Sequence, residues 1–184
     1  KKEKNAIESP NKAYFKNTEG ILPQIIEKLH SEREKAKKEK RELSSYAIKI
    51  IMNSFFGVLA SPNCRYFSLD MANAITYFGQ MIIQLTAKKI EEKGFKVIYM
   101  DTDSCFIDTN MGKEKASILG KELQHYINKF YENYVKANYN RKSYLELEFK
   151  KYYISFILPK IRNIKIEAGS KKRYAGLVEK NGKE

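Results

Sequence analysis

The segment 97–107, Val-Ile-Tyr-Met-Asp-Thr-Asp-Ser-Cys-Phe-Ile, constrains the fold of this chain most. Residues prone to form β-strands flank Asp101 and Asp103, which predicts two strands joined by a tight turn that carries both acids. Two neighbouring carboxylates repel each other unless a cation or solvent compensates their charge. Oxygen ligands of this kind suit Mg²⁺, which commonly shares its coordination shell with substrate phosphates. The segment therefore predicts either a metal site for phosphate chemistry or a solvated Asp-Thr-Asp turn, and on its own it favours neither.

The charge of the chain narrows the choice of partner. Its 35 lysines and arginines exceed its 22 acidic residues, giving a formal net charge of +13 over 184 residues. This charge favours a polyanionic partner, although a lysine-rich proteome produces the same excess. A chain of this length suits one domain, or two sub-domains that share a core.

The cysteines and the apolar runs of the sequence disfavour disulfide-rich, zinc-binding and membrane-spanning proteins. Cys64 and Cys105 stand apart, so neither a disulfide framework nor a zinc site is indicated, and a reducing compartment fits. No signal peptide is visible, and no continuous apolar run approaches the roughly 18 residues that cross a membrane. The chain opens on Lys-Lys-Glu-Lys and closes on polar residues, so we expect a piece of a longer protein.

The first part of the chain predicts a linker followed by a charged helix. Residues 1–20 are polar and contain Pro10 and Gly20, which favours a linker or insert. A helix is predicted from residue 21, with an apolar stripe that stops at Leu29. The stretch 30–42 is crowded with lysine and arginine, so it lies in solvent or against a polyanion.

A second helix is predicted over 46–57, capped by Ser44 or Ser45. It is apolar on nearly every side, so we expect it to be mostly buried. Lys49 and Asn53 nevertheless share one of its faces. Polar groups are costly to bury without partners, so the two predict either a satisfied buried pair or a pair that faces a ligand.

The second half of the chain predicts two long helices and a β-rich end. Helices are expected over 71–93 and 113–137, on either side of the acidic hairpin at 96–109. The alternation in 145–149 predicts a strand with Glu146 and Glu148 on one face. Strands are also expected over 152–158 and 173–178. The Lys-Lys-Arg-Tyr sequence at 171–174 offers phosphate contacts and a stacking ring, or is a generic basic loop.

Three motifs occur in a specific order: Lys49-x-x-x-Asn53-Ser54-x-x-Gly57, then Tyr99-x-Asp101-Thr102-Asp103-Ser104, then Lys171-Lys172-Arg173-Tyr174. Together they resemble the fingers and palm of the family B DNA polymerases, over about residues 20–178. The resemblance implies an α+β fold, in which an antiparallel β palm with packing helices accompanies a two-helix antiparallel fingers hairpin. It implies fingers at 21–60 and part of a palm at 61–178. The palm would contain the catalytic hairpin 96–109 and a primer-grip motif at 169–176, and 179–184 would be a polar tail.

The resemblance also implies roles for single residues. Asp101 and Asp103 would be catalytic and would hold the metal ions, with Glu148 beside them. The incoming dNTP would be bound by Arg33, Lys37, Lys49 and Asn53. DNA would be contacted by Phe56, Gly57, Thr102, Lys171, Lys172, Arg173 and Tyr174. The implied cofactors are two Mg²⁺ ions, for which Mn²⁺ can substitute.

The implied partners are primer–template DNA, dNTPs and the remainder of a polymerase, in the same chain or as a separate subunit, with no membrane. The implied location is the cytoplasm at the nucleoid, or the nucleus in a eukaryote. The implied reaction is template-directed nucleotidyl transfer from dNTP to a primer 3′-hydroxyl by a two-metal mechanism.

Two departures from the family pattern matter. Phe56 stands where the family usually has tyrosine, which removes a hydroxyl near the primer terminus or the nascent pair. The family's first acidic motif, an aspartate followed closely by a Ser-Leu-Tyr-Pro-type run, is absent, and no exonuclease, uracil-reading or thumb segment is recognised. We therefore expect a fragment that is inactive by itself.

Two other functions compete with this interpretation. A catalytically inactive, polymerase-like scaffold that binds nucleic acid is compatible with Phe56, although retention of both Asp101 and Asp103 opposes it. A haloacid-dehalogenase-like phosphatase also has a strand leading into Asp-x-Asp, but Cys105 occupies the position of its threonine or valine, and no aspartate follows Asp108. Reverse transcriptases and viral RNA polymerases typically carry adjacent aspartates in this hairpin, so Asp-Thr-Asp disfavours them.

Overall fold

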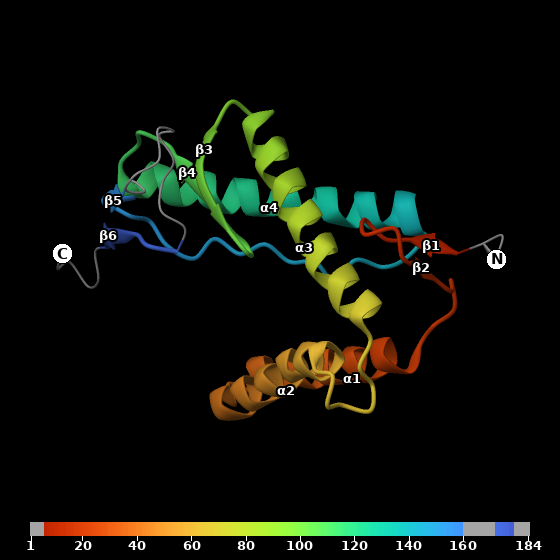
Figure 1. The fold of residues 1–184 in the computed structure, drawn as a ribbon. Coiled ribbons are helices and arrows are strands. Elements are labelled where there is room, and N and C mark those ends of the chain that lie inside the picture. The colour runs from red at the N-terminus through yellow and green to blue at the C-terminus, as the bar shows by residue number, and fades with distance from the viewer. Residues whose placement is uncertain (1–5, 160–171, 179–184) are drawn as a thin grey trace. The chain divides into compact units, whose positions relative to one another are not determined.

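The computed structural model describes residues 6–159 and 172–178, and these divide between two compact units, Lys1–Met81 and Ile82–Glu184. The described residues form long helices together with separate two-stranded antiparallel sheets, which confirms the predicted α+β fold (Figure 1). The elements are β1 (Ile7–Glu8), β2 (Tyr14–Phe15), α1 (Ile21–Lys38), α2 (Glu42–Ala60), α3 (Leu69–Glu91), β3 (Lys96–Asp101), β4 (Ser104–Asp108), α4 (Lys113–Tyr139), β5 (Ser155–Ile157) and β6 (Ala175–Leu177).

The first unit begins with a small β-hairpin inside the predicted linker. Strands β1 and β2 pair antiparallel, with Ile7 opposite Phe15. The buried Ser9 side chain supports the turn, because its hydroxyl donates a hydrogen bond of 2.9 Å to the carbonyl oxygen of Ala13. The described part of 1–20 is therefore locally structured, and its role as a linker or insert stays a prediction.

Helices α1 and α2 form the predicted antiparallel pair, joined by a very short connection. Pro23 lies in the first turn of α1, where its missing N–H costs nothing. At the other end, Lys40 adopts a left-handed backbone with φ 55°, and the Arg41 N–H bonds the Ala36 carbonyl at 2.8 Å. Helix α2 starts at Glu42 without a side-chain cap, so the predicted cap at Ser44 or Ser45 is wrong. The reversal at residues 39–41 leads directly into the second helix, which leaves no place for a cap further along.

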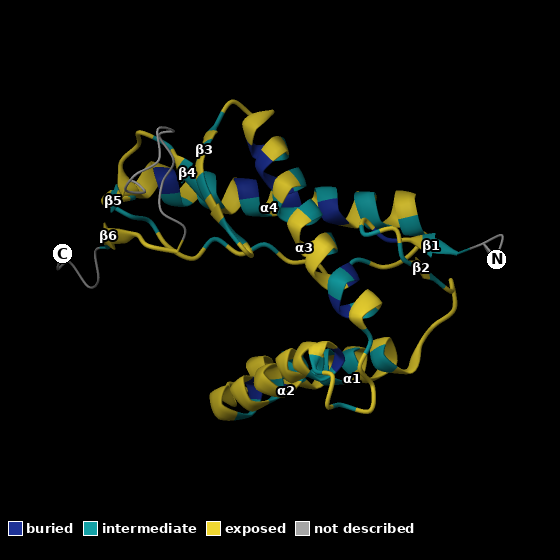
Figure 2. Ribbon diagram, in the orientation of Figure 1, coloured by how far each residue is buried: buried dark blue, intermediate teal, exposed yellow. Residues whose placement is uncertain are grey.

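The expectation that α2 is mostly buried is also wrong. Only Ser45 and Leu59 are buried on this helix, whereas Leu43 is 86% and Tyr46 64% exposed. Most of α2 is accordingly coloured as exposed in Figure 2. Within its unit, α2 packs mainly against α1. One neighbouring helix covers one face, so an all-round apolar helix keeps its other faces in solvent.

Helix α2 meets the length and composition criteria of a membrane span, which the search for a continuous apolar run did not detect. Among the described residues it is the helix long and apolar enough to cross a membrane, by length and composition alone, with a mean hydropathy of 1.4. Its polar residues interrupt any continuous apolar run, and Lys49 near its middle would be costly at the centre of a bilayer. Length and composition alone are weak evidence for a membrane span, and α2 also packs through one face along the charged helix α1.

The second unit has a conventional hydrophobic core. Ile90 from α3 and Ile127 and Tyr131 from α4 are buried together, and Val97, Cys105 and Ile107 of the β3–β4 hairpin pack against them. Thr86 and Tyr131 share a buried hydrogen bond of 2.5 Å between their hydroxyls, which satisfies both polar groups in this core. One face of the β3–β4 hairpin therefore packs against helices α3 and α4.

The predicted strand over 145–149 is not formed, but its side chains still alternate between a half-buried and an exposed side. Leu147 packs on the core while Glu146 and Glu148 are exposed, as the period of two predicts. The segment lies along α4, and side chains of that helix bind its backbone. Asn128 donates to the Leu147 carbonyl at 3.0 Å and accepts from the Leu147 N–H at 2.7 Å. Helix amides therefore satisfy backbone groups that a neighbouring strand would otherwise bind.

Candidate active site at the β3–β4 hairpin

A β-bulge in β3 decides which way the hairpin residues face. Val97 pairs with Ile107, but Tyr99 pairs with Phe106, so Ile98 is an extra residue in this strand. Neighbouring residues on β4 point to opposite faces of the sheet. Val97 and Ile107 therefore share the face that packs on the core, whereas Tyr99 lies on the opposite face with Phe106.

The bulge also sets the direction of the first acid. Asp101 follows Tyr99 by two residues and pairs with Ser104, so it shares the face of Tyr99. In an unbroken strand, Asp101 would instead share the core-facing side with Val97. The extra residue turns a carboxylate away from an apolar core, where it would be costly, to a half-buried position with polar neighbours.

The turn itself holds one acid and exposes the other. Thr102 and Asp103 form the two-residue loop, and Thr102 has φ 47°, a region that β-branched residues rarely adopt. The Thr102 hydroxyl donates to Asp101 Oδ1 at 3.0 Å, and the Ser104 hydroxyl donates to the Asp101 carbonyl at 3.0 Å. Asp103 is exposed, and its side chain has no partner among the residues that the structure describes. An exposed carboxylate beside a fixed one is suited to an incoming cation.

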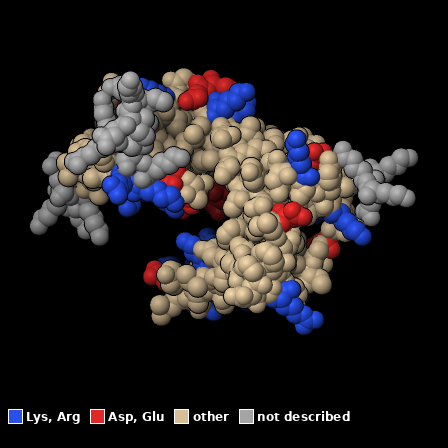
Figure 3. Space-filling view, viewed as in Figure 1, with Lys and Arg blue, Asp and Glu red and all other residues tan. Residues whose placement is uncertain are grey.

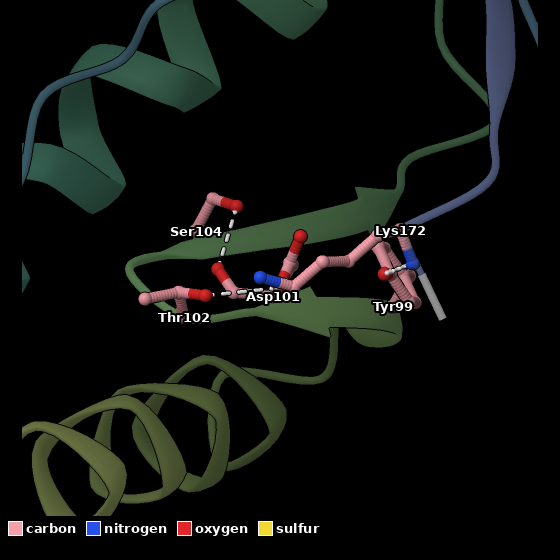
Figure 4. A network of polar contacts seen from close by, with 5 residues as sticks. All are labelled: Tyr99, Asp101, Thr102, Ser104 and Lys172. Atoms are coloured by element: carbon pink, nitrogen blue, oxygen red, sulfur yellow. Dashed lines mark hydrogen bonds and ion pairs between the residues drawn. The ribbon is translucent and has the colours of Figure 1, made fainter. Parts of the chain in front are cut away.

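Lys172 of the third motif lies against this hairpin (Figure 4). The backbone N–H of Lys172 donates to the Tyr99 hydroxyl at 2.8 Å, and Lys172 Nζ lies 3.9 Å from Asp101 Oδ1. Asp101 is thus approached by both an ammonium group and the Thr102 hydroxyl. Two motifs separated by some seventy residues of sequence meet at one carboxylate.

An aromatic cluster fixes this meeting point. Its rings belong to Tyr99, Phe106, Tyr153, Phe156 and Tyr174. The Tyr174 ring centroid lies 5.9 Å from that of Tyr99 and 5.2 Å from that of Phe106, so the third motif is held by its aromatic end as well. Gly176 of β6 is required for this packing, because an added Cβ would overlap the Tyr153 ring.

The donor set at the hairpin fits Mg²⁺ but is incomplete. Mg²⁺ is commonly held by one or two carboxylates together with waters and substrate phosphates, and Asp101 and Asp103 supply that kind of ligand. Within residues 6–159 and 172–178, the structure forms no group of three His, Cys, Asp or Glu side chains that could hold a metal ion. Glu148 is exposed on the segment beside α4 and does not complete such a group with the two aspartates. Its predicted metal role stays a prediction.

The predicted nucleotide-binding cations gather in the first unit. Arg33, Lys37 and Lys49 line one pocket of about 470 Å³ between α1 and α2, close to the connection between the helices. Asn53 is exposed one turn beyond Lys49, which excludes the buried-pair interpretation of these two residues. Lysine and arginine side chains are present on both units in the space-filling view (Figure 3).

Neighbouring charges on α1 partly neutralise the cations of this pocket. Glu34 pairs with Lys37 at 2.7 Å, and the hydrogen bond from Lys37 holds the pKa of Glu34 below its usual value. Arg33 Nε is buried and makes no hydrogen bond within the described part of the chain. The pocket therefore contains a cation that is only partly neutralised and a guanidinium group whose donor is not used.

The predicted DNA contacts fall into three groups. Phe56 and Gly57 are exposed on α2, and Phe56 keeps 41% of its surface accessible. Thr102 is exposed at the hairpin tip, while Arg173 and Tyr174 enter β6 beside Lys172. Lys171 lies outside the described residues. The DNA-binding roles of these residues stay predictions.

Sequence reasoning missed several residues around both sites. The motif around Asp101 assigns Tyr99 no role, yet the Tyr99 hydroxyl accepts the hydrogen bond from the Lys172 N–H. Its spacing of two from Asp101 on a strand would have placed it on the same face. Lys40 and Tyr46 also line the pocket between α1 and α2, and only the helix reversal brings them there.

Cys105 is not a candidate nucleophile. It packs against the core on the face opposite to Asp101, and burial raises the pKa of its thiol to about 11. The thiol stays protonated at neutral pH, whereas nucleophilic cysteines act as thiolates. The chemistry of the hairpin therefore rests on its carboxylates.

Comparisons with known proteins place this geometry in a family. The model of DNA polymerase family B matches residues 2–184. The chain is 36% identical over 174 residues to DNA polymerase II of Escherichia coli (strain K12), covering 94% of this chain and 22% of that protein. It is 34% identical over 152 residues to a DNA polymerase of Desulfurococcus sp. (strain Tok), covering 76% of this chain and 18% of that protein.

A solved structure agrees with the fold. The family B DNA polymerase from Pyrobaculum calidifontis matches with a TM-score of 0.61 at 21% identity, over 94% of this chain and 21% of that chain. The chain thus spans about a fifth of the length of these relatives. The family match overturns the haloacid-dehalogenase-like alternative. With its three motifs in order and two of them in contact, this chain belongs to DNA polymerase family B.

Proposed function

We propose that this chain is part of a template-directed DNA polymerase that transfers nucleotides from dNTP to a primer 3′-hydroxyl. The observation that carries the proposal is the contact of Lys172 with both Tyr99 and Asp101. It unites a basic motif suited to a DNA strand with an acidic motif suited to metal-assisted phosphate chemistry. A solvated turn would need neither the basic neighbour nor the aromatic cluster behind it.

The hairpin acids are proposed to form part of the metal site. Asp101 and Asp103 would hold Mg²⁺, which when bound would activate the primer 3′-hydroxyl and neutralise charge on the leaving phosphates. The Thr102 hydroxyl donates to Asp101 Oδ1, and Lys172 Nζ lies 3.9 Å from the same oxygen, so both are proposed to help orient Asp101. Positioning of this kind is most of what phosphoryl transfer requires of a protein.

The pocket between α1 and α2 is proposed to hold the triphosphate of the dNTP. Arg33, Lys37 and Lys49 present cationic groups to one hollow, where they would attract the β- and γ-phosphates. Asn53 follows on the same face as Lys49 and is proposed to lie near the nucleotide. These side chains stabilise charge and need no covalent chemistry.

The basic motif of β6 is proposed to grip the primer strand. The Lys172 and Arg173 side chains would contact phosphates, and the Tyr174 ring would stay packed on the hairpin. A strand held here would end close to Asp101, because the motif is already docked on that residue.

The site is proposed to need ligands from outside these 184 residues. The described residues form no three-donor metal group, and the sequence lacks the first acidic motif of the family. We expect the missing acid, and the thumb, to come from the remainder of the polymerase in the same chain or as a separate subunit. Alone, the chain is expected to be inactive.

The test is a chimeric polymerase in which these residues replace the matched segment of the Escherichia coli enzyme. We expect primer extension with Mg²⁺, and a loss of about a thousandfold or more for Asp103→Ala. Asp108→Ala is the matched control, because Asp108 lies at the far end of the same hairpin and should keep activity. Extension that survives Asp103→Ala would refute the site. A chimera that binds duplex but never extends it would favour the inactive scaffold.

A further inference from the structure

The pocket between α1 and α2 contains a cation that no sequence motif indicated. Its walls are formed by Arg33, Lys37, Lys40, Glu42, Ser45, Tyr46 and Lys49. Lys40 comes from the connection between the helices, and not from the helical faces that carry the other cations. It therefore reaches the pocket from a different direction.

The charge of this pocket is unbalanced. Four cations face one carboxylate, Glu42, so the lining residues carry a formal net charge of +3 (4 − 1). Lys37 is paired with Glu34, but Lys40 and Lys49 make no ion pair within the part of the chain that the structure describes. Like charges held close together repel, and an anion with several charges relieves this repulsion.

The backbone at Lys40 is one that glycine usually occupies. Lys40 has φ 55°, and its N–H bonds the Lys37 carbonyl at 3.0 Å in the hydrogen-bonding pattern that ends many helices. A side chain at this position costs stability, because Cβ crowds the backbone. Helix α4 ends in the same left-handed conformation with Asn140, a residue that tolerates it better. Glycine would adopt this backbone at lower cost, yet here a lysine occupies it, and its side chain lines the pocket.

We propose that Lys40 is a fourth phosphate-binding cation of this pocket and favours triphosphates over shorter phosphate chains. The proposal rests on the proposed nucleotide-binding function and adds the residue that contributes to selectivity. A longer polyphosphate carries more negative charge, so an additional cation stabilises it more than it stabilises pyrophosphate. Tyr46 and Ser45 bound the pocket beside these cations and contribute its uncharged walls.

The test titrates the 184-residue protein with inorganic tripolyphosphate and with pyrophosphate in a calorimeter, without DNA. We expect Lys40→Gln to weaken tripolyphosphate binding by about two- to fivefold, with a smaller loss for pyrophosphate. Lys38→Gln is the matched control, because it removes the same charge two residues away without lining the pocket, and its binding should stay unchanged. Equal binding by the Lys40→Gln and Lys38→Gln variants would overturn the proposal.

A second variant separates the side chain from the fold. Lys40→Gly fits the left-handed backbone, so we expect unchanged or slightly higher thermal stability together with the same loss of tripolyphosphate binding. Wild-type binding in this variant would also overturn the proposal. If Lys49→Ala weakens binding and Lys40→Gln does not, the nucleotide site stands and only the role of Lys40 fails. If the wild-type protein binds no tripolyphosphate, both fail.

Discussion

The acids of the β3–β4 hairpin and the cations between α1 and α2 are positioned by different means. The hairpin packs on a core in which Ile127 is fully buried, and its other face is held by an aromatic cluster. Helices α1 and α2 bury little, and Ala36 and Leu59 are among their few buried apolar residues. The acids therefore depend on packing from many elements, whereas the cations depend on helical spacing and one reversal of the chain.

This difference agrees with the chemistry proposed for each region. Metal ligands must be held to within a fraction of an ångström, so a rigid foundation is needed beneath Asp101. Phosphate-binding lysines act as flexible point charges, and their long side chains tolerate a less rigid support. Mutations should accordingly act through stability in the second unit and through charge in the first.

The largest contrast is expected between two isoleucines. Ile127→Ala removes a fully buried side chain from α4 and should lower the free energy of unfolding by about 2–5 kcal/mol. Ile50→Ala on α2 removes a side chain that is half exposed and should cost less than about 1 kcal/mol. Urea unfolding followed by circular dichroism measures both. Equal losses would mean that α2 packs as tightly as α4.

The next contrast separates nucleotide use from DNA binding. In the chimeric polymerase, Lys49→Ala should raise KM for dNTP by about tenfold, because a charged contact to phosphate is lost, and should leave duplex binding nearly intact. Lys172→Ala should do the reverse and weaken duplex binding. Steady-state kinetics and a filter-binding assay distinguish the two. Loss of duplex binding in Lys49→Ala would remove that residue from the triphosphate site.

A smaller effect is expected for the Tyr99 hydroxyl. Tyr99→Phe keeps the ring in its cluster but removes the acceptor for the Lys172 N–H, which should cost about 0.5–1.5 kcal/mol of local stability. Hydrogen exchange of the Lys172 amide is the direct measurement. Tyr66→Phe is the control, since Tyr66 is 67% exposed in a loop of the first unit. An unchanged exchange rate in Tyr99→Phe would show that the aromatic packing alone docks the motif.

The smallest effect concerns the surface pair Glu34–Lys37. Glu34→Gln should cost only about 0.3–0.5 kcal/mol at pH 7, because pairs on exposed helix faces contribute little. The pKa of Glu34 is lowered by the hydrogen bond from Lys37, so its contribution is present above the ordinary carboxyl pKa and disappears as the pH falls. The stabilities of the two proteins should converge as the pH falls through the lowered pKa of Glu34. A difference that persists in acid would point to an origin other than charge.

Several features of the fold could be predicted because they depend on local sequence. Helical spacing and Pro23 give the start of α1, and Gly94, with φ 86°, follows the end of α3 as expected of a helix-terminating glycine. The two β-prone runs around Asp101 and Asp103 form the predicted hairpin. In each of these cases the deciding residues lie within a few positions of one another.

Other features could not be predicted, because residues distant in sequence decide them. Segment 145–149 has the pattern of a strand, but Asn128 and Gln124 bind its backbone from α4. Helix α2 has the composition of a buried helix, but within its unit mainly one helix covers it. A sequence pattern states what a segment can bury and does not state which neighbour is available.

The sequence by itself determined the family, the order of the motifs and the type of residue at each site. Only the tertiary structure decided that the bulge at Ile98 turns Asp101 from the core toward Lys172, and that Lys40 joins the pocket of Arg33 and Lys49. The physical reason is that one extra residue reverses the face of every later side chain in a strand. A helix reversal likewise brings together charges that no periodicity relates.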